Sequence, residues 1–326
     1  MPGSRMLGSC RLWDQSLGLG YAVLLVQQIV NGLMIGGLYA LVASGLSLTM
    51  GVLRLMNLSH AVTISIAGIL GVQAVREWHL PFPVLLLYGA LAGGVVGALS
   101  ELVAFGPLRR SRRHDSESSE FAVVLASLAL LFIFRSFAQN YIHYMSPTLE
   151  VLSFPRSAFA PHLISIGPID IRLIAVVILC VSAILTASIW WGVTRTTAGR
   201  AVQAIAADHD TAGMLGINVP AYTISVVALS GALAGISGIL ITAAYTAVDA
   251  FTGDAFLLRA FAVIVLGGIG SLPGAFVGGL VLGLCEALTV HYFGSSWVDL
   301  VAFSLLLLIL VLRPQGLFGK LEVDRA

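Results

Sequence analysis

Charged side chains are scarce in this sequence of 326 residues. Only 10% of the residues are charged, whereas 58% are hydrophobic and the mean hydropathy is +0.97. A soluble domain normally carries about 25% charged residues, so an ordinary water-facing surface is excluded and hydrocarbon must be a second solvent. The length admits roughly eight spans of about 20 apolar residues with their connections. We therefore predict an all-α integral membrane protein.

Lysine and cysteine are scarce as well. Lys320 is the one lysine among seventeen basic residues, and the net charge of +1 comes without the basic stripe of a nucleic-acid-binding protein. Cys10, Cys180 and Cys285 are the three cysteines, and no two of them have metal-ligand spacing. The composition argues against a nucleic-acid partner and against a metal site.

Patterns for nucleotide binding and catalysis are missing too. No glycine-rich loop is followed by Lys and Ser or Thr, and the one lysine lies in the C-terminal tail. No nucleophile, base and orienting group stand in a recognisable arrangement. We expect a protein that is not an enzyme, binds no cofactor and cannot hydrolyse ATP itself.

Long apolar runs fill most of the chain, each of a length suited to crossing a bilayer. They follow a polar N-terminal segment, residues 1–20, and form a single transmembrane domain at residues 21–313, before a tail at residues 314–326. The predicted spans cover residues 23–50, 56–75, 84–105, 121–138, 171–191, 221–244, 256–290 and 297–312.

Two of these runs, 23–50 and 256–290, are too long for one simple helix, so we predict two discontinuous or re-entrant segments. The second run contains clustered glycines and a proline, which lacks the N–H donor of a helix interior. The first run leads into a turn that also interrupts the apolar pattern. Irregular backbone at membrane depth lines cavities, and close packing of helices is the alternative role for the glycines. The resulting candidates for a translocation pathway are Asn57, His60, Gly267, Gly268, Gly270, Ser271, Pro273 and Gly274.

Arginines in short loops orient the chain, because cytoplasmic loops are enriched in basic residues. Loop 106–120 holds four arginines, and loop 192–220 and the tail hold further basic residues. We expect these three segments, and with them the C-terminus, on the cytoplasmic side. Loops 139–170 and 245–255 are then expected outside.

Loop 192–220 has an alanine-rich centre that favours a short amphipathic helix, with Gly216 as a terminating residue. Apolar positions at helical spacing suit a groove on a soluble partner, and a plain connector is the alternative.

Four stretches carry a resemblance to a known family. They are QQIVNG at 27–32 with LYAL at 38–41, MNLSH at 56–60, GRA at 199–201 with LGIN at 215–218, and VLGGIGSLPGA at 265–275. Together they resemble the permeases of branched-chain amino acid ATP-binding-cassette importers, specifically the smaller of the two subunit types. The resemblance covers nearly the whole chain after about Val26.

The resemblance implies a subunit of a larger importer in the bacterial inner membrane. A second permease, homologous or identical, would complete the pathway, two ATPase subunits would bind ATP and magnesium, and a periplasmic or extracellular solute-binding protein would deliver the solute. In the family, loop 192–220 is thought to touch the ATPase. The residues that this assigns to an ATPase-coupling loop are Arg195, Gly199, Arg200, Ala201, Ala207, Asp208, Leu215, Gly216, Ile217 and Asn218.

Two alternatives to branched-chain amino acid import stay open. One is a permease of the same family for urea or short-chain amides. The other is a secondary transporter or channel that works without an ATPase, which a paired acid within the membrane would favour.

Individual ionisable residues within the spans also need an explanation. His60 serves either in the pathway or in holding a bend at a helix start. An unpaired charge at mid-bilayer costs at least about 3 kcal/mol, so pairing or a place near the interface is expected for the others. These are Glu101, Arg135, Arg259, Glu286 and Asp299.

Overall fold

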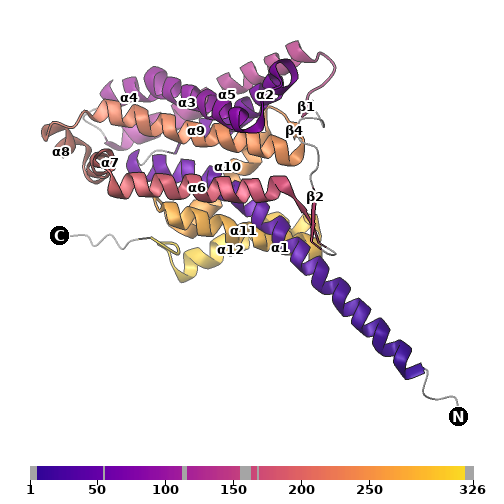
Figure 1. Cartoon of the computed structure of the whole chain (residues 1–326). Helices are drawn as coiled ribbons and strands as arrows, with labels where there is room; N and C mark the ends of the chain where they lie inside the picture. The colour runs from indigo at the N-terminus through magenta and orange to yellow at the C-terminus, as the bar shows by residue number, and fades with distance from the viewer. Residues whose placement is uncertain (1–5, 54–55, 112–115, 155–162, 167–168, 320–326) are drawn as a thin grey trace.

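The computed structural model describes residues 6–53, 56–111, 116–154, 163–166 and 169–319. Within them the chain is almost entirely helical (Figure 1). The helices are α1 Met6–Leu53, α2 Ser59–Trp78, α3 Phe82–Ser100, the π-helical turn Glu101–Phe105, α4 Gly106–Ser111, α5 Ser116–Met145, α6 Leu173–Arg195, α7 Thr197–Ala207, α8 His209–Met214, α9 Val219–Tyr245, α10 Thr252–Gly267, α11 Leu272–Tyr292, the 3-10 turn Ser295–Trp297 and α12 Val298–Leu312.

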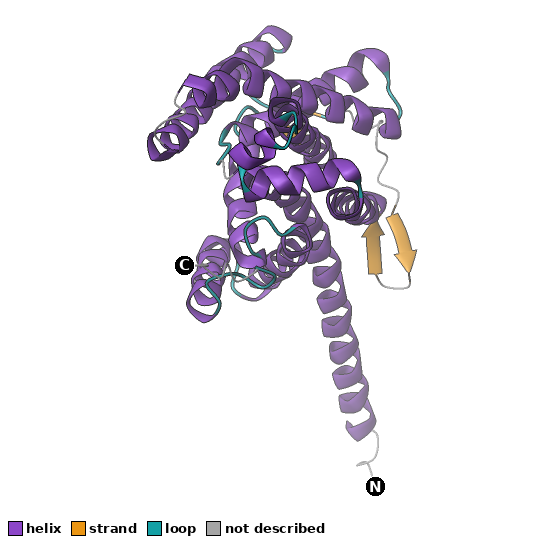
Figure 2. Ribbon diagram, turned by 90° about the vertical axis from the view of Figure 1, so that its left-hand side faces the viewer, coloured by secondary structure: helices purple, strands orange, loops and turns teal. Residues whose placement is uncertain are grey.

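Two short antiparallel strand pairs, which the sequence did not predict, join the helices. Strand β1 (Leu152–Ser153) pairs with β4 (Ala247–Val248). Strand β2 (Leu163–Ile166) pairs with β3 (Ile169–Arg172) to form a hairpin at the edge of the bundle (Figure 2). The strands fall in the two loops that were predicted to lie outside the membrane.

The bundle has two distinct ends (Figure 1). Helices α4, α7 and α8 and the segment after α12 lie at one end, which we call the arginine end because Arg109, Arg200 and Arg313 belong to these segments and Arg195 ends α6 just before α7. Strands β1, β2 and β4 lie at the opposite end, the strand end. The described parts of the loops predicted to share the cytoplasmic side therefore lie together at one end of the bundle, and those of the loops predicted to lie outside are at the other end.

Seven helical segments of the described chain are long and apolar enough to cross a membrane, which supports a multi-pass membrane protein. The central ones are Val23–Leu53, where 72% of the most apolar stretch is buried, and Val219–Tyr245, with 67%. Only 6% is buried in Ser295–Leu312, so that segment lies on the periphery. Helix α2 is less apolar and α10 is shorter, and both are shielded by the bundle, which explains how α2 tolerates buried Ser59, Thr63 and Ser65.

The first long run was predicted to be too long for one simple helix, and this was wrong, whereas the predicted turn at 51–60 is where the helix ends. Helix α1 continues through it to Leu53, and the break follows, before α2 begins at Ser59. The glycines of the run serve close packing instead of a bend. A Cβ on Gly36 would lie 2.8 Å from the Gly279 carbonyl oxygen of α11, and one on Gly32 would lie 2.9 Å from the Cα of Leu284.

The second long run is broken as predicted. Helix α10 ends at Gly267 and α11 begins at Leu272, with Pro273 in its first turn, where the missing N–H costs nothing. Gly268 and Gly270 have φ values of +101° and +79°, which glycine adopts without strain. One predicted span is therefore two helices.

Candidate functional site

A cavity lined by apolar and polar residues lies near the strand end, between α1, α9, α10 and α11. It has a volume of about 400 Å³, within the range of small-molecule sites. Tyr245 is the last residue of α9, Ala247 belongs to β4 and Thr252 begins α10, which fixes the position of the cavity beside the strands. The other lining residues are Ile35, Tyr39, Ile241, Ala255, Phe256, Arg259 and Glu286.

A chain of ionic hydrogen bonds runs along one wall of this cavity. The Tyr39 hydroxyl donates to Glu286 Oε2 at 2.6 Å, and Arg259 Nε donates to Glu286 Oε1 at 3.0 Å. Arg259 Nη1 donates to the Ala255 carbonyl at 3.2 Å, and Nη2 donates to Asp299 Oδ1 at 3.0 Å. The side chain of Glu286 is 5% exposed, whereas that of Asp299 is 76% exposed. The chain therefore extends from the bundle interior to the surface.

Aromatic rings form another part of the wall. Phe256 lies between two tyrosines, with ring centroids 5.8 Å from Tyr39 and 6.0 Å from Tyr245. These tilted arrangements are the favourable ones for aromatic pairs. The cavity thus combines an apolar aromatic surface with one cation and one buried anion, which suits a small solute with both charges and an apolar part.

The remaining intramembrane charges are paired, as expected. Arg135 of α5 donates to both carboxylate oxygens of Asp254 at 2.5 and 2.7 Å, and its guanidinium lies 4.7 Å from the ring centroid of Phe251. Glu101, in the π-helical turn, is paired with Arg109. Neither pair lines the 400 Å³ cavity.

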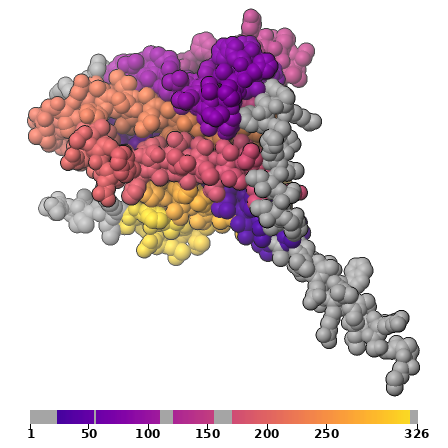
Figure 3. All heavy atoms as spheres, in the orientation of Figure 1, coloured from indigo at the N-terminus to yellow at the C-terminus, as the bar shows by residue number. Residues whose placement is uncertain are grey.

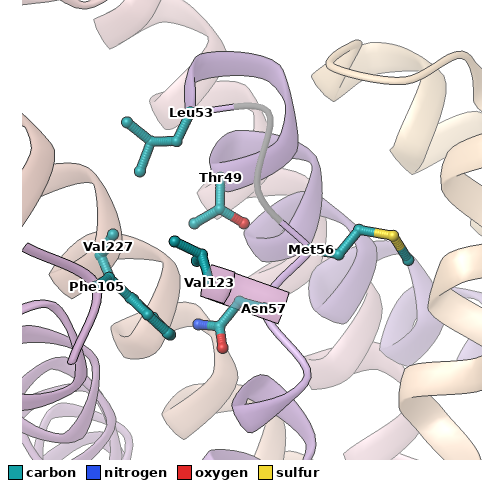
Figure 4. Close-up of a pocket in the computed structure, with 7 residues that line it drawn as sticks. All are labelled: Thr49, Leu53, Met56, Asn57, Phe105, Val123 and Val227. Atoms are coloured by element: carbon teal, nitrogen blue, oxygen red, sulfur yellow. The ribbon is translucent and has the colours of Figure 1, made fainter. Parts of the chain in front are cut away.

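Asn57 and His60 lie away from that cavity. Asn57 faces a space of about 10 Å³, no larger than one water molecule, together with Thr49, Phe105 and Val123 (Figure 4). Its Oδ1 accepts hydrogen bonds from the backbone N–H and the hydroxyl of Ser59 at 3.1 and 2.6 Å. These bonds hold the first residue of α2.

His60 is buried at the start of α2, between α1 and α9. Its Nδ1 lies 3.5 Å from Ser230 Oγ, and a Cβ on Gly45 would lie 2.9 Å from its Cε1. Its Nε2 has no hydrogen-bond partner among the described residues. The imidazole therefore packs between two helices and does not line the large cavity.

The glycine turn between α10 and α11 lies at the arginine end. A Cβ on Gly51, near the end of α1, would lie 2.7 Å from the Cα of Gly270, so the two breaks in the apolar pattern touch. The backbone N–H groups of Leu317 and Phe318 donate to the carbonyls of Leu266 and Gly267 at 2.9 and 3.0 Å. The segment after α12 thus satisfies carbonyls left free at the end of α10.

The six pathway candidates of this turn are brought together, but away from the large cavity. Ser271 Oγ caps α11 by accepting from the Gly274 N–H at 3.1 Å. Gly267 and Gly274 approach each other so closely that a Cβ on either would meet the backbone of the other. Close packing accounts for the glycines and the capped, proline-initiated helix start.

The segment predicted to couple to an ATPase forms two short helices where one was predicted. Arg195 ends α6, α7 contains Gly199, Arg200, Ala201 and Ala207, and α8 follows after Asp208. Gly216, at φ +84°, ends the turn after Leu215 and before Ile217, and Asn218 caps α9 by accepting from the Ala221 N–H at 3.3 Å. All ten residues therefore lie in one segment, 195–218, at the arginine end, where α7 and α8 project from the bundle (Figures 1 and 3).

Helix α7 is amphipathic, as predicted. Its Val202 and Ile205 are buried, and Ile205 packs against Ala212 of α8 and Val219 of α9. Beyond this small core, Met214 and Leu215 are 80% and 75% exposed. The projecting α7–α8 pair, which we call the α7–α8 hairpin, therefore presents two large apolar side chains where α8 ends. Leu215 was predicted from the sequence and Met214 was not, although the two are adjacent.

Asp208 holds the junction between α7 and α8. Its Oδ1 accepts from the backbone N–H groups of Asp210 and Thr211 at 2.9 and 3.0 Å, and Oδ2 accepts from the Thr211 hydroxyl at 2.7 Å. The hydrogen bonds from Thr211 lower the pKa of Asp208, because they favour the charged carboxylate. This N-cap explains why one predicted helix is two.

Arg259, Glu286 and Asp299 were predicted from the sequence to need pairing, but their partners were not, and neither Tyr39 nor Phe256 was predicted as a site residue. A signal was present, since three charges fall on α10, α11 and the start of α12 in a chain that is otherwise poor in charge. Their meeting around a cavity depends on tertiary packing, which a single sequence does not display.

Comparisons with known proteins cover nearly the whole bundle. The family described as "Branched-chain amino acid transport system / permease component" matches residues 28–311. The chain is 30% identical to the high-affinity branched-chain amino acid transport system permease protein LivH of Escherichia coli K12, over 92% of this chain and 97% of that protein. It is also 30% identical to BraD of Pseudomonas aeruginosa, with the same coverage, and 26% identical to the ribose import permease protein RbsC of Haemophilus influenzae, over 91% of this chain and 85% of that protein.

Proposed function

Because the chain belongs to the family of branched-chain amino acid transport permease components, we propose that it forms part of the membrane pathway of an ATP-binding-cassette importer for branched-chain or related amino acids. The observation that carries the proposal is the match to LivH along 92% of the chain, together with the family match at residues 28–311, which includes every residue that lines the 400 Å³ cavity. The cavity supports it, since its aromatic wall and its paired charges suit such solutes.

The orientation follows from the arginine rule. The arginine end faces the cytoplasm, the strand end faces outward, and the tail after α12 is cytoplasmic in a bacterial inner membrane. The cavity then lies on the side from which a solute-binding protein delivers its cargo. A second permease, homologous or identical, completes the pathway.

The α7–α8 hairpin is the proposed contact with the ATPase subunits. A short helix whose apolar tip projects into water suits a groove on a soluble partner. Met214 and Leu215 are the proposed anchors, at 80% and 75% exposure. ATP and magnesium belong to the ATPase subunits in this proposal, and this chain is a transport subunit without catalytic residues of its own.

Uptake in vesicles tests the proposal. Vesicles contain this chain, the co-encoded permease, ATPase and binding-protein partners, and internal ATP, with radiolabelled leucine as solute and urea as comparison. We expect leucine uptake that requires ATP. Leucine uptake without ATP would contradict the importer assignment and favour a secondary transporter, and uptake of urea alone would assign a different solute within the family.

Substitutions at the hairpin test the coupling role within the same assay. Arg200→Glu and the double change Met214→Ser with Leu215→Ser alter exposed side chains and should leave the assembled bundle intact. We expect both to abolish ATP-driven uptake. Phe293→Ser is the matched control, because Phe293 is 70% exposed but follows α11, far from the hairpin. Equal losses in the control and the hairpin variants would contradict the assignment.

A further inference from the structure

Two charges that line the 400 Å³ cavity, Arg259 and Glu286, join a third, Asp299, which pairs with Arg259 from outside the lining, in a chain that has few charges. Arg259 comes from α10, Glu286 from α11 and Asp299 from the start of α12. Apolar residues of similar volume would join these helices at lower cost, because each buried ion must be removed from water. A charged cluster at this position therefore indicates a function beyond holding the helices together.

The two acidic partners of Arg259 differ in a way that matters for binding. Glu286 is 5% exposed and its second oxygen accepts a hydrogen bond from Tyr39. This carboxylate therefore fixes the position of the Arg259 guanidinium. Asp299 is 76% exposed, and an exposed ion pair contributes little because water competes with it. The Nη2 group of Arg259 is thus preorganised and has an easily displaced partner.

We propose that the cavity binds the transported amino acid as a zwitterion, with its carboxylate on Arg259 Nη2 in place of Asp299 and its ammonium on the released Asp299. This inference rests on the proposed function and adds a recognition site within the permease itself. The apolar side chain of the solute then lies against Phe256, between the rings of Tyr39 and Tyr245.

Charge balance sets the selectivity of such a site. Arg259 contributes one positive charge, and Glu286 and Asp299 contribute two negative charges, so the cluster has a net charge of −1 when all three are ionised. A zwitterion leaves this balance unchanged, whereas a carboxylate without an ammonium adds a second uncompensated negative charge. Leucine should therefore bind better than 4-methylpentanoate, which lacks the ammonium. It should also bind better than leucinamide for a different reason: leucinamide lacks the carboxylate that would accept from Arg259 Nη2, although its positive charge alone would suit the cluster.

Ligand-observed NMR on the assembled importer without its binding protein tests this inference. Saturation transfer from the complex in lipid nanodiscs to leucine, leucinamide and 4-methylpentanoate gives the relative affinities. We expect leucine to bind at least about tenfold more tightly than either analogue, as for loss of one charged hydrogen bond. Arg259→Gln should weaken leucine binding and abolish its preference over leucinamide, because the carboxylate loses its donor and the remaining cluster has a net charge of −2.

Arg135→Gln is the matched control. Arg135 is also an ion-paired intramembrane arginine, but it does not line the cavity, so the preference for leucine over leucinamide should persist. The inference is overturned if the wild-type complex binds no leucine, or if Arg259→Gln keeps the wild-type preference. ATP-driven leucine uptake, measured with the binding protein present, separates this failure from a failure of the proposed function.

Discussion

The hydroxyl of Tyr39 donates a hydrogen bond of 2.6 Å to Glu286, although the two residues are 247 positions apart. It joins α1 to α11, two helices whose glycines pack closely, and it does so on the wall of the cavity. The bond occupies the carboxylate oxygen that Arg259 leaves free. Tyr39 therefore determines how the buried carboxylate is oriented toward the arginine.

Tyr39→Phe should destabilise the protein and weaken transport. The change removes one hydroxyl and leaves a buried carboxylate oxygen without its donor, which costs about 1–3 kcal/mol. The measurement is the unfolding free energy in detergent together with leucine uptake. Tyr245→Phe is the control, since the Tyr245 hydroxyl makes no hydrogen bond to another described residue. Equal effects of the two changes would show that the Tyr39 bond contributes nothing.

Neighbouring glycines of α3 should respond differently to alanine. A Cβ on Gly93 would lie 2.8 Å from the Cα of Gly235 in α9, whereas one on Gly94 would lie 3.4 Å from the nearest atom, the Ala228 carbonyl oxygen. Overpacking at such a contact typically costs about 1–3 kcal/mol. Gly93→Ala should therefore lower the unfolding free energy, and Gly94→Ala should not. Equal stability of the two variants in a thermal or denaturant assay would contradict the packing described for α3 and α9.

Asp208 should make the α7–α8 hairpin sensitive to acid. Its pKa is lowered in the folded protein, so its contribution is present above the ordinary pKa of an aspartate and is lost as the pH falls through the lowered value. Amide exchange at Asp210 and Thr211 should then accelerate only below the usual aspartate range. Asp208→Ala should show fast exchange at neutral pH, and Asp208→Asn, which retains a capping oxygen, should remain close to wild type. If Asp208→Asn exchanged fast at neutral pH while Asp208→Ala did not, this account of the cap would be contradicted.

Local patterns in the sequence were sufficient for much of the fold. Apolar runs predicted the spans, the proline and glycines at 267–274 predicted the break between α10 and α11, and arginine placement predicted which loops share an end. Each of these features depends on residues that are close in sequence, and hydropathy and helix-breaking are properties of such short segments.

Contacts between segments that are distant in sequence could not be predicted from those patterns. The length of the run at 23–50 suggested that it was not one helix, but its glycines meet Gly279 and Gly283 of α11, and this packing could be seen only in the tertiary contacts. The cavity could not be predicted for the same reason, since Tyr39 and Phe256 have the sequence context of ordinary residues in apolar helices. Glu286 was noticed because charge is rare in the spans, yet its partners come from α1 and α10.

The contact between His60 and Gly45 allows the role of this histidine to be tested. Gly45→Ala should destabilise the protein, because its Cβ would lie 2.9 Å from His60 Cε1. His60→Ala should also destabilise it by leaving a cavity between α1 and α9.

In the double variant the added methyl enters the space that the imidazole vacates. The combined loss of unfolding free energy should then be smaller than the sum of the single losses, with a coupling of about 0.5–3 kcal/mol. Additive losses would show that the two side chains do not compete for one space. Because the histidine lies outside the large cavity, the double variant should also recover more leucine uptake than either single variant. A double variant that is stable yet inactive would instead assign His60 a direct part in transport.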